Sequence, residues 1–206
     1  MTLDVLERPA AGDPAGTLLL LHGRGADEHD LFPLLDALDP ERRLHGVTPG
    51  GPLALPPGGR HWYRLAGIPT PDAGTFWPSF EALSELIDGL VPPLVVGGFS
   101  QGAVMSYALG LGRGPEARPA ALLPLSGFVP RVEGLELDLT GLEGYPVAIA
   151  HGSLDPVISV EWSREARATL TRAGADVTYN EAPLPHTIDP QIIPALRHFV
   201  TNAVGR

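Results

Sequence analysis

The sequence predicts an α/β domain in which helices cover both faces of a mostly parallel sheet. Short apolar runs alternate with segments whose apolar residues recur at helical spacing. Runs that are apolar at nearly every position are typical of strands buried on both faces. A chain of 206 residues can form one well-buried core, and no internal repeat indicates a second. We therefore expect a single domain over residues 1–206.

The predicted elements follow from these patterns in chain order. The strongest strand candidates are residues 17–21, 94–99, 121–125 and 147–150, and the weaker ones are 44–48, 176–180 and a possible N-terminal edge strand, "TLDVLE". Helical spacing covers residues 31–38, 83–90, 104–108, 162–170 and 191–200. The last helix follows Asp189, a plausible N-cap, and Pro190, which suits a first turn.

Residues 49–78 are expected to form an irregular excursion near the active site, because they are rich in Pro and Gly. The segment also carries four aromatic residues, Trp62, Tyr63, Phe76 and Trp77. Two explanations remain open: the rings fasten the loop to the body of the domain, or some of them bind substrate.

Composition narrows the class of ligand. The formal net charge of −10, with 24 acidic residues and 14 basic residues that are all Arg, argues against nucleic acid and anionic membranes. The chain has no Cys, so it has no disulfide and no thiolate nucleophile. Its N-terminus lacks a signal-peptide pattern, and no apolar run is long enough to span a bilayer. We expect a cytoplasmic protein without membrane insertion that acts on a small molecule.

The stretch "GGFSQG" contains a GxSxG motif centred on Ser100. In a nucleophile elbow, glycines permit a sharp turn from strand to helix that exposes the serine hydroxyl. The motif is common by itself, and Ser100 could instead be a structural turn residue. The buried strand predicted before it and the helix predicted after it favour the nucleophile.

A nucleophilic serine needs a base, and the base needs an orienting acid. His186 lies between the last predicted strand and the last helix, which places it at the carboxyl edge of the sheet with Ser100. Asp155 follows the strand 147–150, and the order Ser100, Asp155, His186 is that of α/β-hydrolases. Asp176 and Asp189 are weaker candidates, because the first opens a strand and the second precedes a helix.

The other six histidines are not expected to be the base. His22 and His151 come directly after strands, where an imidazole commonly braces a loop. His198 lies beside the apolar stripe of the last helix, at its margin or in solvent. The remaining three have no suitably placed carboxylate: His29, His45 and His61.

A tetrahedral oxyanion needs two backbone donors. One is expected to be the amide of Gln101, and the other the amide of Arg24, between Gly23 and Gly25 in "LLHGRGAD". This glycine-rich loop could also suggest a phosphate cradle, but it lacks the lysine and the glycine spacing of a P-loop.

Four blocks, "LLHGRGAD", "HWYRL", "GGFSQGAVMS" and "HGSLDPVI" followed by "PH", resemble the phospholipase/carboxylesterase family of α/β-hydrolases, which includes the acyl-protein thioesterases. They frame residues 18 to about 200. The resemblance implies an α/β-hydrolase fold without a large cap domain, no metal, no cofactor, and hydrolysis of carboxylic esters or thioesters. It assigns the same triad and the same oxyanion amides. It also implies that a homodimer is possible.

Three positions depart from the family pattern. Arg24 stands where Leu is often found, Arg64 follows the aromatic pair where Asp is frequent, and Pro185 replaces a frequent Gly. The two arginines could favour a substrate with a carboxylate or phosphate, or they could simply pair with surface acids.

The sequence therefore predicts a serine carboxylesterase that hydrolyses short- or medium-chain acyl esters through an acyl-enzyme. A thioesterase or a lysophospholipase of the same family is the alternative. A non-catalytic ligand-binding protein of the same fold is a more distant one. An enzyme of the dienelactone-hydrolase type commonly uses a cysteine nucleophile, which this chain does not contain.

Overall fold

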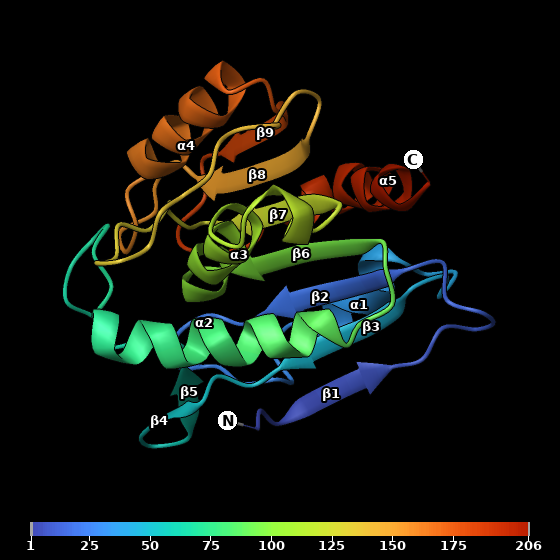
Figure 1. Cartoon of the computed structure of the whole chain (residues 1–206), viewed down its shortest axis with the longest axis horizontal. Helices are drawn as coiled ribbons and strands as arrows, with labels where there is room; N and C mark the ends of the chain where they lie inside the picture. The colour runs from blue at the N-terminus through green and yellow to red at the C-terminus, as the bar shows by residue number, and fades with distance from the viewer. Residues whose placement is uncertain (1, 206) are drawn as a thin grey trace.

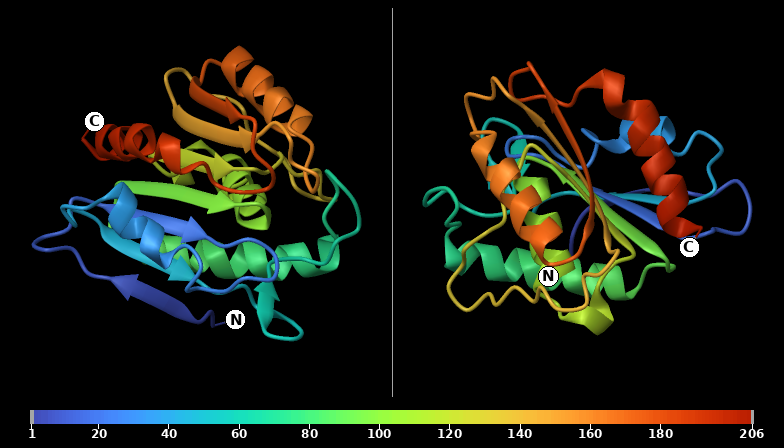
Figure 2. Two further views of the ribbon diagram at one scale, coloured as in Figure 1. Left: turned by 180° about the vertical axis from the view of Figure 1, so that it is seen from behind. Right: turned by 90° about the horizontal axis from the view of Figure 1, so that it is seen from above.

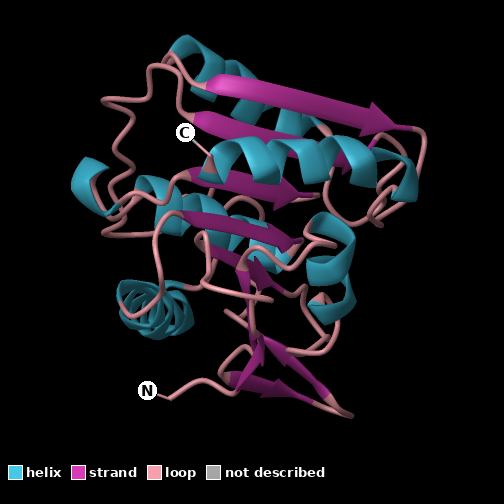
Figure 3. Cartoon of the chain, turned by 90° about the vertical axis from the view of Figure 1, so that its right-hand side faces the viewer, coloured by secondary structure: helices cyan, strands magenta, loops and turns pink. Residues whose placement is uncertain are grey.

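A computed structural model of the chain describes residues 2–205 and contains a seven-stranded sheet in the order β1-β3-β2-β6-β7-β8-β9 (Figure 1). The strands are β1 (Val5–Arg8), β2 (Thr17–Leu21), β3 (His45–Pro49), β6 (Leu94–Phe99), β7 (Ala121–Leu125), β8 (Pro146–Gly152) and β9 (Asp176–Ala182). Only the edge strand β1 is antiparallel to its neighbour; all other neighbours in this sheet are parallel. Strand direction rotates progressively across the sheet (Figure 3), as expected from the normal twist.

Helices cover both faces of the sheet, as Figure 2 shows. The helices are α1 (Phe32–Leu38), α2 (Ala73–Asp88), α3 (Gln101–Leu111), α4 (Glu161–Arg172) and α5 (Ile193–Val204), with short 3₁₀ turns at Pro115–Ala117 and Pro190–Ile192. Helices α2, α3 and α4 pack on one face, and α1 and α5 on the other.

Strand β2 illustrates why the sequence folds in this way. Every residue of "TLLLL" is buried, and successive side chains point to opposite faces. Leu19 and Leu21 join the core beneath α2 and α3, whereas Leu18 and Leu20 join the core beneath α1 and α5. A strand with two buried faces is apolar on both of them, so its sequence does not alternate; the one polar side chain here, Thr17, donates its hydroxyl proton to the Val91 carbonyl at 2.8 Å.

The expected excursion over residues 49–78 contains more regular structure than the sequence indicated. Strand β3 continues to Pro49, and a hairpin follows, formed by β4 (Leu53–Leu55) and β5 (Gly59–His61). Helix α2 already begins at Ala73, where the Asp72 side chain accepts a hydrogen bond from the Thr75 amide. The irregular part is therefore limited largely to residues 62–72.

The start of the last helix also differs from the prediction. Asp189 does act as a cap, because its side chain accepts a hydrogen bond from the Gln191 amide, but it caps the 3₁₀ turn Pro190–Ile192. Helix α5 itself begins at Ile193. The strands run in parallel, so the loops after β2, β6, β8 and β9 meet at one edge of the sheet, at the left in Figure 1.

Candidate active site

Ser100 lies in the sharp turn between β6 and α3, and its backbone is strained. Its φ of 56° and ψ of −116° are unusual for a residue with a side chain. The turn is held by hydrogen bonds from the Ser100 amide to the Leu125 carbonyl, 2.9 Å, and from the Val104 amide to the Ser100 carbonyl, 3.2 Å. Such strain is the geometry of a nucleophile elbow.

The glycines of the motif are required by close backbone packing. A Cβ atom at Gly102 would lie 1.9 Å from the Leu21 carbonyl oxygen, and one at Gly98 would lie 2.4 Å from the Gly102 carbonyl carbon. The first turn of α3 therefore packs directly on the end of β2. Only glycine fits at these two positions, which explains the GxSxG spacing in this chain.

Asp155 and His186 come together at the same edge. His186 Nδ1 lies 2.5 Å from Asp155 Oδ2, and the carboxylate is completely buried. The other oxygen, Oδ1, accepts hydrogen bonds from the Val157 and Ile158 amides at 2.8 and 2.9 Å. The His186 ring packs on Phe99, the residue before Ser100, with a centroid separation of 4.7 Å.

These contacts decide the charge of Asp155. Burial by itself raises the pKa of a carboxylate, but the hydrogen bonds from His186, Ile158 and Val157 outweigh it and lower the pKa of Asp155 below its ordinary value. The ionised carboxylate accepts the Nδ1 proton of His186, so Nε2 of a neutral His186 is free to act as a base.

The loops that carry Asp155 and His186 are packed backbone to backbone. A Cβ atom at Gly152 would lie 2.2 Å from the Leu184 carbonyl oxygen and 2.4 Å from that of Pro185. The Leu154 amide donates a hydrogen bond to the Leu184 carbonyl, 3.1 Å. Gly152 thus allows the loop after β8 to hold the loop that contains His186.

The two histidines assigned to loops do brace them, but His151 does more. His22 Nδ1 donates to the Gly23 carbonyl at 2.7 Å, and its Nε2 accepts from the Gly51 amide at 2.8 Å. His151 Nε2 lies 3.2 Å from Asp155 Oδ2, a contact that the sequence reasoning missed. The signal was present in the four-residue spacing of "HGSLD", but only the turn brings the two side chains together.

The proposed oxyanion loop runs past Ser100. A Cβ atom at Gly23 would lie 3.4 Å from the Ser100 Cβ, so Arg24 follows a residue in contact with the elbow. Gly25 has φ of +88° and donates its amide to the Arg60 carbonyl at 2.8 Å. Gln101 is the first residue of α3, directly after Ser100.

Three of the four aromatic residues fasten the chain and do not line a pocket. Trp62, Tyr63 and Phe76 are at most 1% exposed, so they offer no ring surface to a substrate. The Trp62 amide donates to Gln101 Oε1 at 3.0 Å, and Gln101 Nε2 donates to the Tyr63 carbonyl at 2.9 Å. We call these two hydrogen bonds the Gln101 clasp; it joins the 62–72 loop to the elbow.

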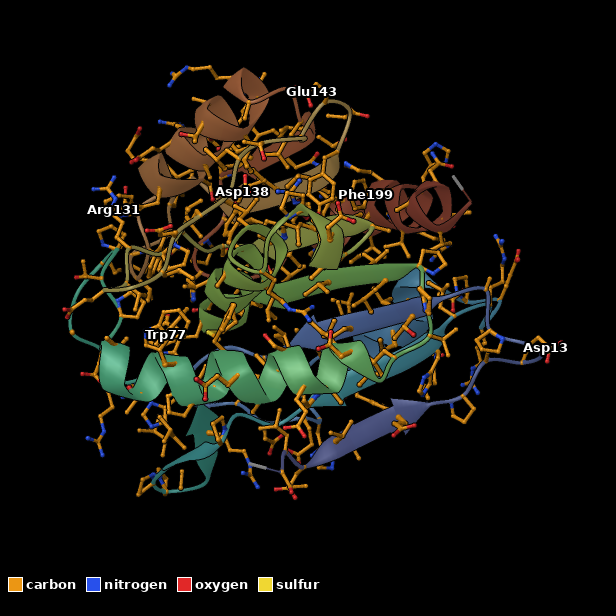
Figure 4. The ribbon with its side chains drawn as sticks, in the orientation of Figure 1. Asp13, Trp77, Arg131, Asp138, Glu143 and Phe199 are labelled. Atoms are coloured by element: carbon orange, nitrogen blue, oxygen red, sulfur yellow. The ribbon has the colours of Figure 1, made fainter. Side chains whose placement is uncertain are left out.

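The fourth aromatic residue, Trp77, is half-buried on α2. Its Nε1 donates to the Glu133 carbonyl at 3.0 Å, and Figure 4 shows the side chain on the side of α2 that faces the loop carrying Arg131. Trp77 also serves as a fastening, since it connects α2 to the loop after β7.

His29, His45 and the two unusual arginines differ from expectation. His45 does meet a carboxylate, Glu7 at 2.9 Å, and His29 meets Asp27 at 3.3 Å, so the assumption that they lacked one was wrong. His45 begins β3, at the edge opposite Ser100. Arg24 and Arg64 are exposed, and neither forms an ion pair within residues 2–205. Pairing with surface acids therefore does not account for them.

Exposed apolar side chains gather near the same edge. Leu65 and Ile68 lie in the 62–72 loop and are 62% and 40% exposed; Leu154 and Val157 follow β8 and are 65% and 58% exposed. The loops around Ser100 thus present both apolar side chains and arginines.

One group of side chains in the loop after β2, the loop that carries Arg24, resembles a set of metal ligands. Among the residues described, one group of possible metal ligands lies close together: Asp27, Glu28 and His29. Exposed groups of this kind are common without a metal. Within the described part of the chain, no helix is long and apolar enough to cross a membrane.

The fold is that of an α/β-hydrolase, and solved structures agree with it over almost the whole chain. The Bacillus cereus carboxylesterase superposes with a TM-score of 0.81 at 25% identity, covering 98% of this chain and 94% of that one. The esterase PE8 superposes with a TM-score of 0.82 at 24% identity, covering 98% and 100%.

The chain belongs to the phospholipase/carboxylesterase family, whose model matches residues 7–204. It is 30% identical to MhqD of Bacillus subtilis (strain 168) over 175 residues, which cover 81% of this chain and 83% of the relative. It is 29% identical to acyl-protein thioesterase 1 of Yarrowia lipolytica (strain CLIB 122 / E 150) over 178 residues, 77% of this chain and 78% of the relative. The protein is thus an esterase or thioesterase of a family of serine hydrolases.

Proposed function

We propose that this protein is a serine carboxylesterase for short- or medium-chain acyl esters, with Ser100, Asp155 and His186 as its catalytic triad. The observation that carries the proposal is the 2.5 Å contact between His186 Nδ1 and Asp155 Oδ2. The His186 ring also packs on Phe99, and the next residue is Ser100, whose backbone is strained. Family membership supports the same chemistry.

In the proposed reaction, Ser100 Oγ attacks the acyl carbon while His186 Nε2 takes its proton. Asp155 holds the imidazole and stabilises its positive charge. The amides of Arg24 and Gln101 donate to the oxyanion of the tetrahedral intermediate. His186 then protonates the leaving alkoxide, and water cleaves the acyl-enzyme by the same route.

The test is hydrolysis of nitrophenyl esters of increasing acyl length by the wild type and by Ser100→Ala. We expect turnover that depends on Ser100 and peaks at one acyl length. Asp155→Asn should lower kcat by about four orders of magnitude, because it disturbs the His186 tautomer. Activity should rise with pH along one acidic limb, since the base must be neutral.

The series should include a half-ester of a dicarboxylic acid, because neither Arg24 nor Arg64 forms an ion pair with another described residue. It should also include a nitrophenyl thioester, which separates an esterase from a thioesterase, and a lysophospholipid. Equal rates for wild type and Ser100→Ala on every substrate would contradict the proposal. Fluorophosphonate labelling of Ser100 would then distinguish a hydrolase with another substrate from a binding protein.

A further inference from the structure

His151 is a second imidazole on the carboxylate of Asp155. Its side chain is completely buried, and its Nε2 lies 3.2 Å from Asp155 Oδ2 and 2.9 Å from the Ile158 carbonyl oxygen. The same Oδ2 atom accepts the Nδ1 proton of His186 at 2.5 Å. Two histidines, one from β8 and one from the loop after β9, thus converge on one carboxylate oxygen.

The neighbours of His151 determine its tautomer. Nε2 faces two oxygen acceptors, so it must carry the proton, and Nδ1 must then be an acceptor. The Ser163 hydroxyl, from α4, lies 2.6 Å from Nδ1 and is the group that donates to it. The other acceptor for this hydroxyl, the Gly127 carbonyl, is 3.4 Å away, beyond a good O–H···O distance.

His151 is a neutral donor because it is buried. Burial lowers the pKa of His151 below its ordinary value, so the ring is uncharged at neutral pH. Glu181 of β9 also faces this region, but it pairs with Arg164 of α4. Asp189 lines the same cavity of about 70 Å³ as His151 and Glu181, and its carboxylate caps the Gln191 amide.

We propose that His151 is a positioning residue for the reaction: its Nε2–H donates to the Ile158 carbonyl and lies 3.2 Å from Asp155 Oδ2, where its positive end holds that oxygen in place for His186 and makes it a weaker acceptor. The proposal rests on the proposed function, because it assigns Asp155 and His186 to the triad. Without this donor, the carboxylate attracts a proton on His186 more strongly. His186 then becomes neutral only at a higher pH.

The test compares His151→Leu, which removes the donor, with His151→Gln, whose amide N–H can reach the same oxygen. For His151→Leu we expect kcat per labelled site to fall at least roughly tenfold with KM nearly unchanged. We also expect the midpoint of the acidic limb of the pH profile to rise by about one unit or somewhat less. His151→Gln should restore most of the kcat and most of the wild-type midpoint. Ser163→Ala should lower kcat and raise the midpoint by smaller amounts than His151→Leu.

Active sites are counted by fluorophosphonate labelling, so that loss of folded protein is not mistaken for loss of kcat. If His151→Leu does not fold, Ser163→Ala carries the test. An unchanged midpoint of the acidic limb in His151→Leu would overturn the proposal, because a merely structural histidine would change stability alone. If Ser163→Ala has to replace that variant, an unchanged midpoint in Ser163→Ala has the same meaning. The proton titration of His186, followed by NMR, should show the same upward shift without any substrate. That readout decides the role of His151 even if Ser100→Ala shows that the proposed function is wrong.

Discussion

At the scale of single residues, the sharp turn at Ser100 depends on glycine, because a side chain at Gly102 would not fit. Gly102 has no room for a Cβ, because this atom would lie 1.9 Å from a backbone oxygen of β2 that cannot move without distorting the sheet. By contrast, Gly58 in the β4–β5 hairpin has nothing within 4 Å of a Cβ position. Gly58→Ala is therefore a suitable control for Gly102→Ala.

We expect Gly102→Ala to lower the free energy of unfolding by about 2 kcal/mol or more, as overpacking of a tight contact does. Gly58→Ala should change it by less than about 0.5 kcal/mol. Urea denaturation measures both. If Gly102→Ala were as stable as Gly58→Ala, α3 would not pack against the backbone of β2 as tightly as described.

Single residues also show how far sequence reasoning reaches. Ser100, Asp155 and His186 could be proposed because each follows a recognisable strand and chain order restricts the choice. The contact of His151 with Asp155 could not be found in this way, since it depends on how the turn folds back. The burial of Trp62 is equally invisible, because an aromatic residue in a Pro- and Gly-rich segment can point inward or outward.

At the scale of elements, the Gln101 clasp ties the 62–72 loop to the start of α3. The Gln101 side chain is buried and satisfies one donor and one acceptor of the loop backbone. The loop also joins the segment after β7, where the Arg131 amide donates to the Pro69 carbonyl at 2.8 Å. A loop held at both ends is expected to be rigid close to Ser100.

Gln101→Leu keeps the backbone amide and nearly the same size but removes both hydrogen bonds. The buried Trp62 amide then loses its partner, whereas the Tyr63 carbonyl keeps its contact with His61 Nδ1 at 3.1 Å, so we expect stability to fall by about 1 to 2 kcal/mol. Limited proteolysis should cleave the 62–72 loop sooner than in the wild type. Gln191→Leu, at an exposed position, is the control. Equal cleavage rates in the two variants would show that the clasp does not hold the loop.

The elements themselves could be predicted largely because buried parallel strands are apolar at nearly every position. The strands 94–99 and 121–125 have the same bounds in the structure as in the prediction. The start of α2 was missed, because Pro and Gly obscure a helix that a local cap at Asp72 begins. The 3₁₀ turn before α5 was also missed, since Asp-Pro signals a first turn without specifying which kind.

At the scale of the whole molecule, the fold buries several histidines in their neutral form. Burial lowers the pKa values of His22, His61 and His151 below their ordinary values. In the unfolded chain these rings bind protons near about pH 6.5. At pH values just below this, the unfolded state therefore holds more protons than the folded state, and folding becomes less favourable as the pH falls.

We expect the free energy of unfolding, measured with urea, to be nearly constant from pH 8 to 7 and to fall steadily from about pH 6.5 to pH 5. Substitution of a contributing histidine should make this fall shallower. His22→Asn keeps a donor for the Gly23 carbonyl but leaves the Gly51 amide without an acceptor, so it should be less stable at pH 8 and less sensitive to acid. His198→Asn, at an exposed position, should follow the wild type throughout. A flat wild-type curve down to pH 5, or a His22→Asn curve parallel to it, would mean that the folded protein accepts protons on these rings, contrary to the burial described here.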